Sequence, residues 1–210
     1  TKKDLKNCRP VWRDTLKGNY HQYEIVAMAP PSSGGIHVIQ MLNILEEHNL
    51  VAMGHNSATY AALLTESMKY AYADRSEYLG DPGFFDVPVK SLTSKTYAKQ
   101  INKRITLNTI TPSNEILPGA AMPPESPDTT HFSVADADGN IISNTYTLNS
   151  GFGSGIVIDG TGVLMNNEMD DFVSAPGVPN QFGLVGGEAN KIEPFKRPLS
   201  SMTPTLILKD

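Results

Sequence analysis

Two adjacent threonines in the middle of the chain could supply a nucleophile. They stand in ESPDTTHFSV, residues 125–134, where a proline-rich stretch ends at Asp128 and alternating apolar and polar residues follow Thr129. A threonine hydroxyl is a weak nucleophile at neutral pH and needs a general base. If the chain were cut before Thr129, its new α-amine, with a pKa of about 7.7–8.0, could be that base. The commoner alternative is a buried strand that simply begins at this point.

Histidine and cysteine give little support for a metal centre. The five histidines show neither H-x-x-x-H nor H-E-x-x-H spacing, so no metal site is expected. Cys8 is the only cysteine, which excludes an internal disulfide and leaves no cysteine cluster. His131 shares a strand face with Thr129 and could assist its hydroxyl, although a hydrogen-bonded or core histidine is commoner.

The densest acidic cluster lies in NNEMDDF, residues 166–172. It could be a glycosidase-like acid/base pair or a site for a hard cation, but a solvated turn is the commoner outcome. Ser200 and Ser201 precede a final apolar run, where hydroxyls usually stabilise a turn. The segment GFGSG, residues 151–155, matches neither nucleotide-binding motif and predicts a turn between strands.

Hydrophobic periodicity indicates that helices in the first half of the chain position these groups. Residues 32–49 predict a helix that Ser32 or Ser33 caps and that carries an apolar face of Val38, Met41, Leu42 and Leu45. Further helices are expected at 56–79 and 94–105.

Strand signals dominate the second half. A hairpin is expected over 130–148, with its turn at Asp138-Gly139-Asn140, and single strands at 23–31, 155–159 and 203–209. Residues 106–128 lack periodicity and include four prolines between 117 and 128, which predicts an exposed, mobile linker. Residues 174–197 predict a long loop, and loops of that length are often functional.

The composition indicates one globular domain and argues against several partners. The chain has 210 residues, of which 40% are hydrophobic and 19% charged. Its net charge of -5 and the lack of a basic run argue against nucleic acid as a partner. No apolar run approaches the roughly 18 residues of a membrane span.

Six ordered segments of the chain match one known family. They are PPSSGGIHVIQMLNILE, DTTHFSV, NTYTLNSGFGSG, NNEMDDF, GVPNQFGLVGGEAN and KRPLSSMTPT. The chain resembles the γ-glutamyltranspeptidases, which are N-terminal-nucleophile hydrolases. In that family the precursor is cut just before the threonine of T-T-H, which implies cleavage between Asp128 and Thr129. Residues 1–128 then correspond to the C-terminal part of the large subunit, with a flexible linker from about 106. Residues 129–210 correspond to the N-terminal part of the small subunit, and both belong to one domain.

The resemblance also implies roles for single residues. Thr129 corresponds to the nucleophile and Thr147 to the residue that hydrogen-bonds it and assists cleavage. Other positions match those that hold the substrate's α-amino group, namely Asn149, Glu168 and Asp171. Those that hold its α-carboxylate correspond to Ser200 and Ser201. The assignment is physically reasonable because an ammonium group needs carboxylate acceptors and a carboxylate needs hydroxyl or N–H donors.

Two parts of the family's site differ or are expected elsewhere. Residues 174–190 resemble the lid loop, in which many bacterial members carry tyrosine where this chain has Phe182. The missing hydroxyl removes a possible hydrogen bond and leaves apolar cover. The family's substrate-clamping arginine is expected before Thr1 and its oxyanion-hole glycine pair after Asp210. Because one missing oxyanion donor costs ~10²–10³ in rate, we expect this segment alone to be inactive.

The implied fold is a four-layer α/β/β/α sandwich of the α+β class, of which this chain would be a part. The implied activity is γ-glutamyl transfer from, or hydrolysis of, glutathione and related compounds through a γ-glutamyl-threonine ester. Amino acids or peptides would accept the group, and no metal or organic cofactor is needed. The two subunits would form a heterodimer in the periplasm or outside the cell.

Two alternatives stay open. One is a related acylase that acts on glutaryl-cephalosporins or poly-γ-glutamate. Glu168 and Asp171 argue against a glutaryl substrate, because such a substrate has no amine for them to bind. The other alternative is a non-catalytic binding domain on the same fold, which would not cleave itself.

Overall fold

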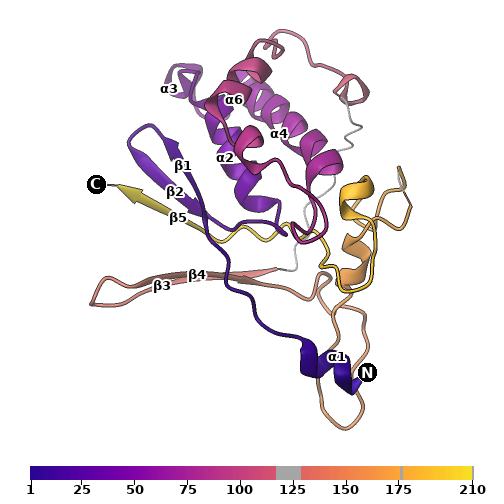
Figure 1. Cartoon of the computed structure of the whole chain (residues 1–210). Helices are drawn as coiled ribbons and strands as arrows, with labels where there is room; N and C mark the ends of the chain where they lie inside the picture. Colours follow the sequence, from indigo (N-terminus) through magenta and orange to yellow (C-terminus); the bar gives the residue numbers. More distant parts are fainter. Residues whose placement is uncertain (117–128, 176, 210) are drawn as a thin grey trace.

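The helices, a sheet and a hairpin lie in three successive layers (Figure 1). The computed structural model describes residues 1–116, 129–175 and 177–209. The first layer holds the main helices, α2 (Gly34–Leu45), α4 (Ala58–Tyr78) and α6 (Lys95–Asn102). The second layer is an antiparallel sheet in the order β1 (Leu16–Tyr20), β2 (Tyr23–Ala27) and β5 (Thr205–Lys209). The third is the hairpin of β3 (Thr130–Ala135) and β4 (Ile141–Tyr146).

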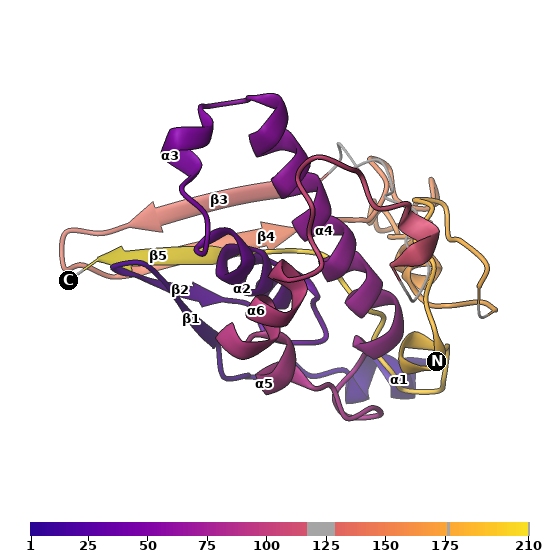
Figure 2. The ribbon, with the colours of Figure 1, turned by 90° about the horizontal axis from the view of Figure 1, so that it is seen from above.

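Short helices fill the connections. They are α1 (Lys2–Asn7), α3 (Leu50–Met53), α5 (Val89–Leu92) and the 3₁₀ turns η1 (Ser113–Glu115), η2 (Glu168–Asp171) and η3 (Glu188–Asn190). Seen from above in Figure 2, α2 lies over β1 and β2, and α4 and α6 flank it. No helix in the described part of the chain is long and apolar enough to cross a bilayer.

The three main helices, the hairpin, β2 and β5 all lie where the sequence predicts them. The hairpin pairs Thr130 with Tyr146 and turns at Gly139, whose φ of 85° favours glycine. Asp136 stabilises the turn, because its Oδ1 accepts hydrogen bonds from the N–H groups of Asp138 (3.0 Å) and Asn140 (2.8 Å). The strand expected at 155–159 is wrong, since only an isolated bridge between Val157 and Leu164 forms there.

The buried face of α2 differs from the predicted one. Ile36, Ile39 and Ile44 are fully buried, whereas Val38 and Met41 are only partly buried and line a cavity. Of the predicted face, Leu45 is buried as expected, whereas Val38 and Met41 form part of the cavity wall, because periodicity identifies an apolar stripe but cannot tell a core from a cavity wall.

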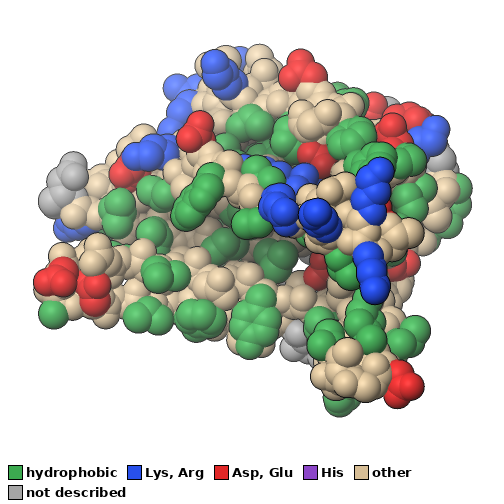
Figure 3. All heavy atoms as spheres, turned by 60° about the horizontal axis from the view of Figure 1, so that its bottom comes forward, with side chains coloured by type: hydrophobic (Ala, Val, Ile, Leu, Met, Phe, Trp, Pro, Cys, Tyr) green, Lys and Arg blue, Asp and Glu red, His purple; other side chains and the backbone are tan. Residues whose placement is uncertain are grey.

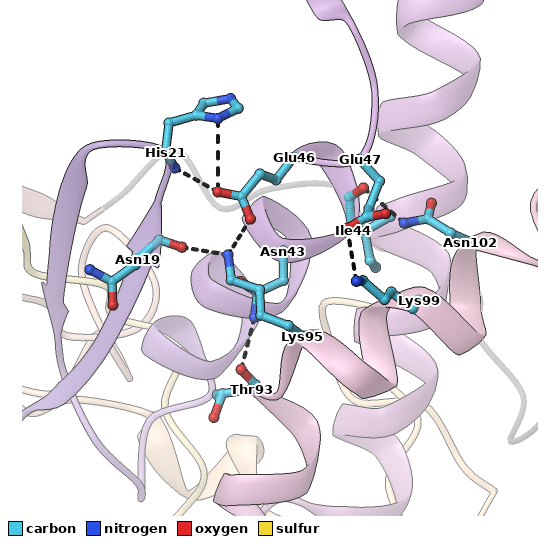
Figure 4. Close-up of polar contacts among 10 residues, drawn as sticks. All are labelled: Asn19, His21, Asn43, Ile44, Glu46, Glu47, Thr93, Lys95, Lys99 and Asn102. Atoms are coloured by element: carbon cyan, nitrogen blue, oxygen red, sulfur yellow. Dashed lines mark hydrogen bonds and ion pairs between the residues drawn. The ribbon is translucent and has the colours of Figure 1, made fainter.

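The C-terminal end of α2 is tied to its neighbours by polar contacts (Figure 4). Glu46 accepts hydrogen bonds from the His21 N–H (2.6 Å) and from Lys95 of α6. Asn43 donates to the Thr93 carbonyl at 2.8 Å, and Asn102 donates to the Ile44 carbonyl at 3.0 Å. The Glu46 contacts connect α2 and α6 to the β1–β2 turn, and the two asparagine contacts hold α2 to Thr93 and to α6.

A buried ion pair on α4 holds the segment that follows α6. Lys69 and Glu66 are 3% and 2% exposed and lie 2.5 Å apart. Lys69 also donates to the Thr111 carbonyl at 2.6 Å, and the Thr111 N–H donates to Glu66 at 3.3 Å. Ile116 is buried in the same helical core. Most residues from 106 to 115 are exposed, as expected of a linker, but Thr111 and Ile116 fasten this part to the helical layer. The rest of the expected linker, including Asp128, lies outside the described residues.

Substituting Lys69 by methionine in the full-length protein should destabilise the fold by about 3 kcal/mol or more, because it leaves the Glu66 carboxylate buried without a partner. The double variant Glu66→Gln/Lys69→Met removes both charges and should lose less. Denaturant unfolding measures both changes. Lys99→Met is a matched control, since Lys99 forms an exposed pair with Glu47 and should contribute under about 1 kcal/mol. A Lys69→Met loss no larger than the control's would contradict this account.

The hairpin carries an exposed apolar surface, seen along the β3–β4 side in Figure 3. Phe132, Val134, Ile142 and Tyr146 are each about half exposed. The expectation that a buried strand begins at Thr130 is wrong for this structure, in which β3 is exposed throughout. The reason is that β3 and β4 pack extensively only with each other among the described elements.

Candidate active site

One cavity of about 400 Å³ lies where α2, α4, the hairpin end and two loops meet. The predicted site residues around it are Thr129, Thr147, Asn149, Asp171, Phe182, Ser200 and Ser201. Its apolar wall includes Val38 and Met41 of α2 and Met68 and Tyr72 of α4. Residues far apart in the sequence thus converge on one space, and Glu168 is the predicted substrate-binding residue that does not line it.

The hairpin brings two threonine hydroxyls together. Thr130 pairs with Tyr146 at the last rung of the ladder, so Thr129 and Thr147 lie opposite each other just beyond it. The Thr129 Oγ1 donates to the Thr147 Oγ1 at 3.3 Å. Thr147 Oγ1 also accepts from the Asn149 N–H at 2.9 Å, which fixes its orientation. Thr147 can therefore polarise the Thr129 hydroxyl or hold it in place.

An acidic group faces the same cavity from η2. The Asn149 side chain donates to Asp171 Oδ1 at 3.1 Å, and Asn149 has a φ of 77°, a left-handed conformation that asparagine tolerates. Burial raises the pKa of Asp171 to about 6, although the Asn149 hydrogen bond and the charge of Arg75 oppose this rise. The carboxylate is thus ionised at neutral pH and can accept hydrogen bonds from a cation in the cavity.

Glu168 lies at the other end of η2 and plays a less direct part in this geometry. It is partly buried, and burial raises its pKa. Its negative charge also helps to raise the pKa of Asp171. The structure therefore brings Asp171, and not Glu168, to the cavity wall.

The serine pair is fixed by the start of α2. Ser200 accepts hydrogen bonds at its carbonyl from the Ser33 N–H (2.8 Å) and the Ser33 hydroxyl (3.2 Å). Gly34 lies so close that an added Cβ would be 2.0 Å from Thr203 Oγ1. Of the two serines expected to cap α2, Ser33 makes no side-chain capping bond, whereas the Ser32 hydroxyl accepts from the Gly34 N–H at 3.3 Å. This glycine allows the approach that brings Ser200 and Ser201 to the cavity.

Two residues that the sequence analysis did not identify also lie beside the site. Arg75 of α4 is 5% exposed and donates to Ser201 Oγ at 3.4 Å. His37 of α2 lines the cavity, and burial, together with the charge of Arg75, lowers its pKa to about 3, so it is neutral. Neither residue stands in a recognisable spacing, because both owe their place to the packing of α2 against α4.

His131 makes a local contact instead of serving the nucleophile. Its Nδ1 lies 2.7 Å from the Thr145 hydroxyl, and it is absent from the lining of the cavity. Within the described ranges, no group of three or more His, Cys, Asp or Glu residues is arranged to hold a metal ion.

Residues 1–210 match the model of the gamma-glutamyltranspeptidase family, so the chain belongs to that family. It is 54% identical over its whole length to a glutathione hydrolase proenzyme of Escherichia coli (strain K12), of which it covers 36%. It is 41% identical, over 99% of its length, to the acylase ACY 1 proenzyme of Pseudomonas sp. (strain SE83), of which it covers 35%. The chain thus spans about a third of these relatives.

Solved structures confirm the expected fold class. Helicobacter pylori gamma-glutamyltranspeptidase matches 56% of the chain with a TM-score of 0.55 and 46% identity, over 34% of its own chain. Cephalosporin acylase from Bacillus halodurans matches all of it with a TM-score of 0.76 and 28% identity, over 35% of its own chain. The three observed layers are part of the N-terminal-nucleophile hydrolase sandwich.

Proposed function

We propose that the protein containing this chain transfers or hydrolyses γ-glutamyl groups through an ester on Thr129. The observation that carries the proposal is the contact of 3.3 Å between the Thr129 and Thr147 hydroxyls, in a cavity that also holds Asp171 and the serine pair. Glutathione and related γ-glutamyl compounds fit this arrangement, because their glutamyl end carries both an ammonium and a carboxylate.

The chemistry follows from the groups present. The α-amine of Thr129, freed by cleavage, takes the proton of its own hydroxyl as Oγ1 attacks the γ-carbonyl carbon. The amine of the leaving group departs with that proton, and a γ-glutamyl ester remains on Thr129. Water then hydrolyses the ester, or the amine of an amino acid or peptide takes the acyl group. No step needs a metal or an organic cofactor.

Processing creates the base that this mechanism needs. Before cleavage Thr129 has no free amine, so its hydroxyl attacks the Asp128 carbonyl with help from Thr147. Water opens the resulting ester, and Thr129 becomes a chain start. The relatives' description as proenzymes supports this proposal. The two chains would remain together as a heterodimer, in the periplasm or outside the cell.

Recognition of the substrate divides between two sides of the cavity. Asp171, with Asn149 and Glu168, would hold the α-ammonium, and the hydroxyls of Ser200 and Ser201 would donate to the α-carboxylate. Phe182 lines the cavity from the loop that we assign as the lid, where it provides apolar cover. A glutaryl substrate would leave Asp171 facing no cation, which costs binding energy.

A direct test compares two anilides with the same leaving group. The full-length enzyme should release the aniline from a γ-glutamyl anilide and transfer the acyl group to a dipeptide amine. The matching glutaryl anilide, which lacks only the α-amine, should be turned over far more slowly. Faster turnover of the glutaryl compound would favour the acylase alternative, and no turnover of either would favour a binding domain.

The pH dependence of kcat/KM should report the ionisation of Asp171. Its pKa of about 6 means that the acceptor for the ammonium is lost as pH falls through that value. Protonation of the Thr129 amine should give both substrates a shared acid limb near its pKa of about 7.7–8.0. The γ-glutamyl anilide should lose kcat/KM on a second acid limb near pH 6, whereas the glutaryl anilide should show a weaker limb there. Identical acid limbs for both substrates would contradict the assignment of Asp171 to the amine.

A further inference from the structure

Arg75 is a buried cation with an unusual set of partners. Its guanidinium donates from Nε to Ser33 Oγ and from Nη2 to Ser201 Oγ, both at 3.4 Å. No carboxylate within the described ranges lies within 4.0 Å of it. Burying a charge is costly unless it is paired, and hydroxyls alone compensate it poorly. This residue therefore needs an explanation beyond the packing of α4.

The groups that face Arg75 come from three elements. Arg75 interacts electrostatically with Asp171 of η2, His37 of α2 and Tyr72 of α4. His37 is neutral, so Asp171 is the group among these three that carries a charge opposite to that of the guanidinium. Around Asp171 stand two further carboxylates, Glu168 and Asp170, which repel its charge. Arg75 is the cation that offsets this repulsion.

The position of Arg75 separates it from the substrate. It lines a neighbouring cavity of about 310 Å³ together with Asp170 and Asp171, whereas the lining of the 400 Å³ cavity does not include it. Asp171 lines both cavities and so connects the cavity of Arg75 with that of the reacting groups. Arg75 thus contacts the site through Ser201 but does not line the 400 Å³ cavity itself.

We propose that Arg75 is the positioning residue of the substrate site, which holds the Ser201 hydroxyl on one side and shares a cavity with the Asp171 carboxylate on the other. The proposal rests on the γ-glutamyl function described above. One guanidinium then couples the amine-binding and carboxylate-binding sides, so that a substrate carrying both groups meets a preformed pair of partners. The planar guanidinium of arginine suits two separate partners better than the ammonium of lysine, because its N–H donors point in fixed directions.

The test uses the full-length enzyme with Arg75→Gln and Arg75→Lys. The glutamine variant removes the charge, so the acid limb near pH 6 that Asp171 gives to kcat/KM for the γ-glutamyl anilide should move to higher pH by about one unit or more. The lysine variant keeps the charge but loses the fork, so its acid limb should move less while KM rises roughly 10-fold. The glutaryl anilide should show a smaller shift of the limb. Arg197→Gln is the matched control, because Arg197 is exposed and should leave both quantities unchanged.

Each outcome decides the proposal. An unmoved acid limb in Arg75→Gln, or wild-type KM in Arg75→Lys, would overturn it. If the glutamine variant does not fold, the KM and the pH profile of the lysine variant carry the test. If neither variant folds or cleaves itself, the role of Arg75 is structural and the proposal fails. Absence of γ-glutamyl turnover in the wild-type enzyme would instead refute the proposed function.

Discussion

Substituting Thr129 by alanine in the full-length precursor is expected to abolish both self-cleavage and turnover. The variant loses the hydroxyl that, in the proposed mechanism, attacks the Asp128 carbonyl during processing and the γ-carbonyl during catalysis. Loss of a covalent nucleophile costs on the order of 10⁴-fold or more in kcat. Initial rates with a γ-glutamyl anilide measure the catalytic loss, and intact mass measures the cleavage.

A conservative variant distinguishes chemistry from folding. Thr129→Ser keeps the hydroxyl beside Thr147 and should retain slow cleavage and measurable activity. Thr129→Ala should melt at a temperature close to that of an uncut wild-type precursor, since Thr129 is exposed and makes no core contact. Rapid turnover by the alanine variant would show that Thr129 is not the nucleophile.

The second large effect concerns the choice of substrate. Asp171→Asn in the full-length enzyme should lower kcat/KM for a γ-glutamyl anilide by roughly 10²–10³-fold, because the ammonium loses its charged partner in a partly buried site. The glutaryl anilide, which has no amine, should be affected much less. Kinetics with both substrates give the ratio directly.

A neighbouring carboxylate provides the control. Asp170 lies one residue away, but its side chain accepts from the Gln181 N–H at 3.0 Å and lines the other cavity. Asp170→Asn should therefore change kcat/KM for both substrates by a similar, small factor. Equal losses on the two substrates in Asp171→Asn would mean that Asp171 does not bind the amine.

Local signals predicted most of the fold. The alternation on both sides of Asp138-Gly139-Asn140 predicted the hairpin, and the same ladder explains why Thr129 lies opposite Thr147. Hydrophobic periodicity does not predict which polar and charged side chains are buried. The buried face of α4 contains Glu66, Lys69 and Asp74. Glu66 and Lys69 pair with each other along the helix, but their contacts to Thr111 and the contact of Asp74 to Gln40 exist only because tertiary structure brings these groups near.

Motifs suggested the candidate site residues, but the arrangement of these residues could not be predicted from the sequence. Matching segments identified residues from Thr129 to Ser201 and suggested that they would meet. They did not show that Glu168 does not line the cavity or that Gly34 allows the serine pair to reach it. Arg75 was missed because a single arginine in a helix has no signature, and its role depends on partners 42 and 126 residues away.

The most direct test of the account is N-terminal sequencing, with intact mass, of the wild-type full-length precursor as it matures. The account predicts two chains, the smaller of which begins Thr129-Thr130-His131, and activity that rises in step with cleavage. A single uncut chain with full activity, or a small chain that begins at any other residue, would contradict the assignment of Thr129 as an N-terminal nucleophile.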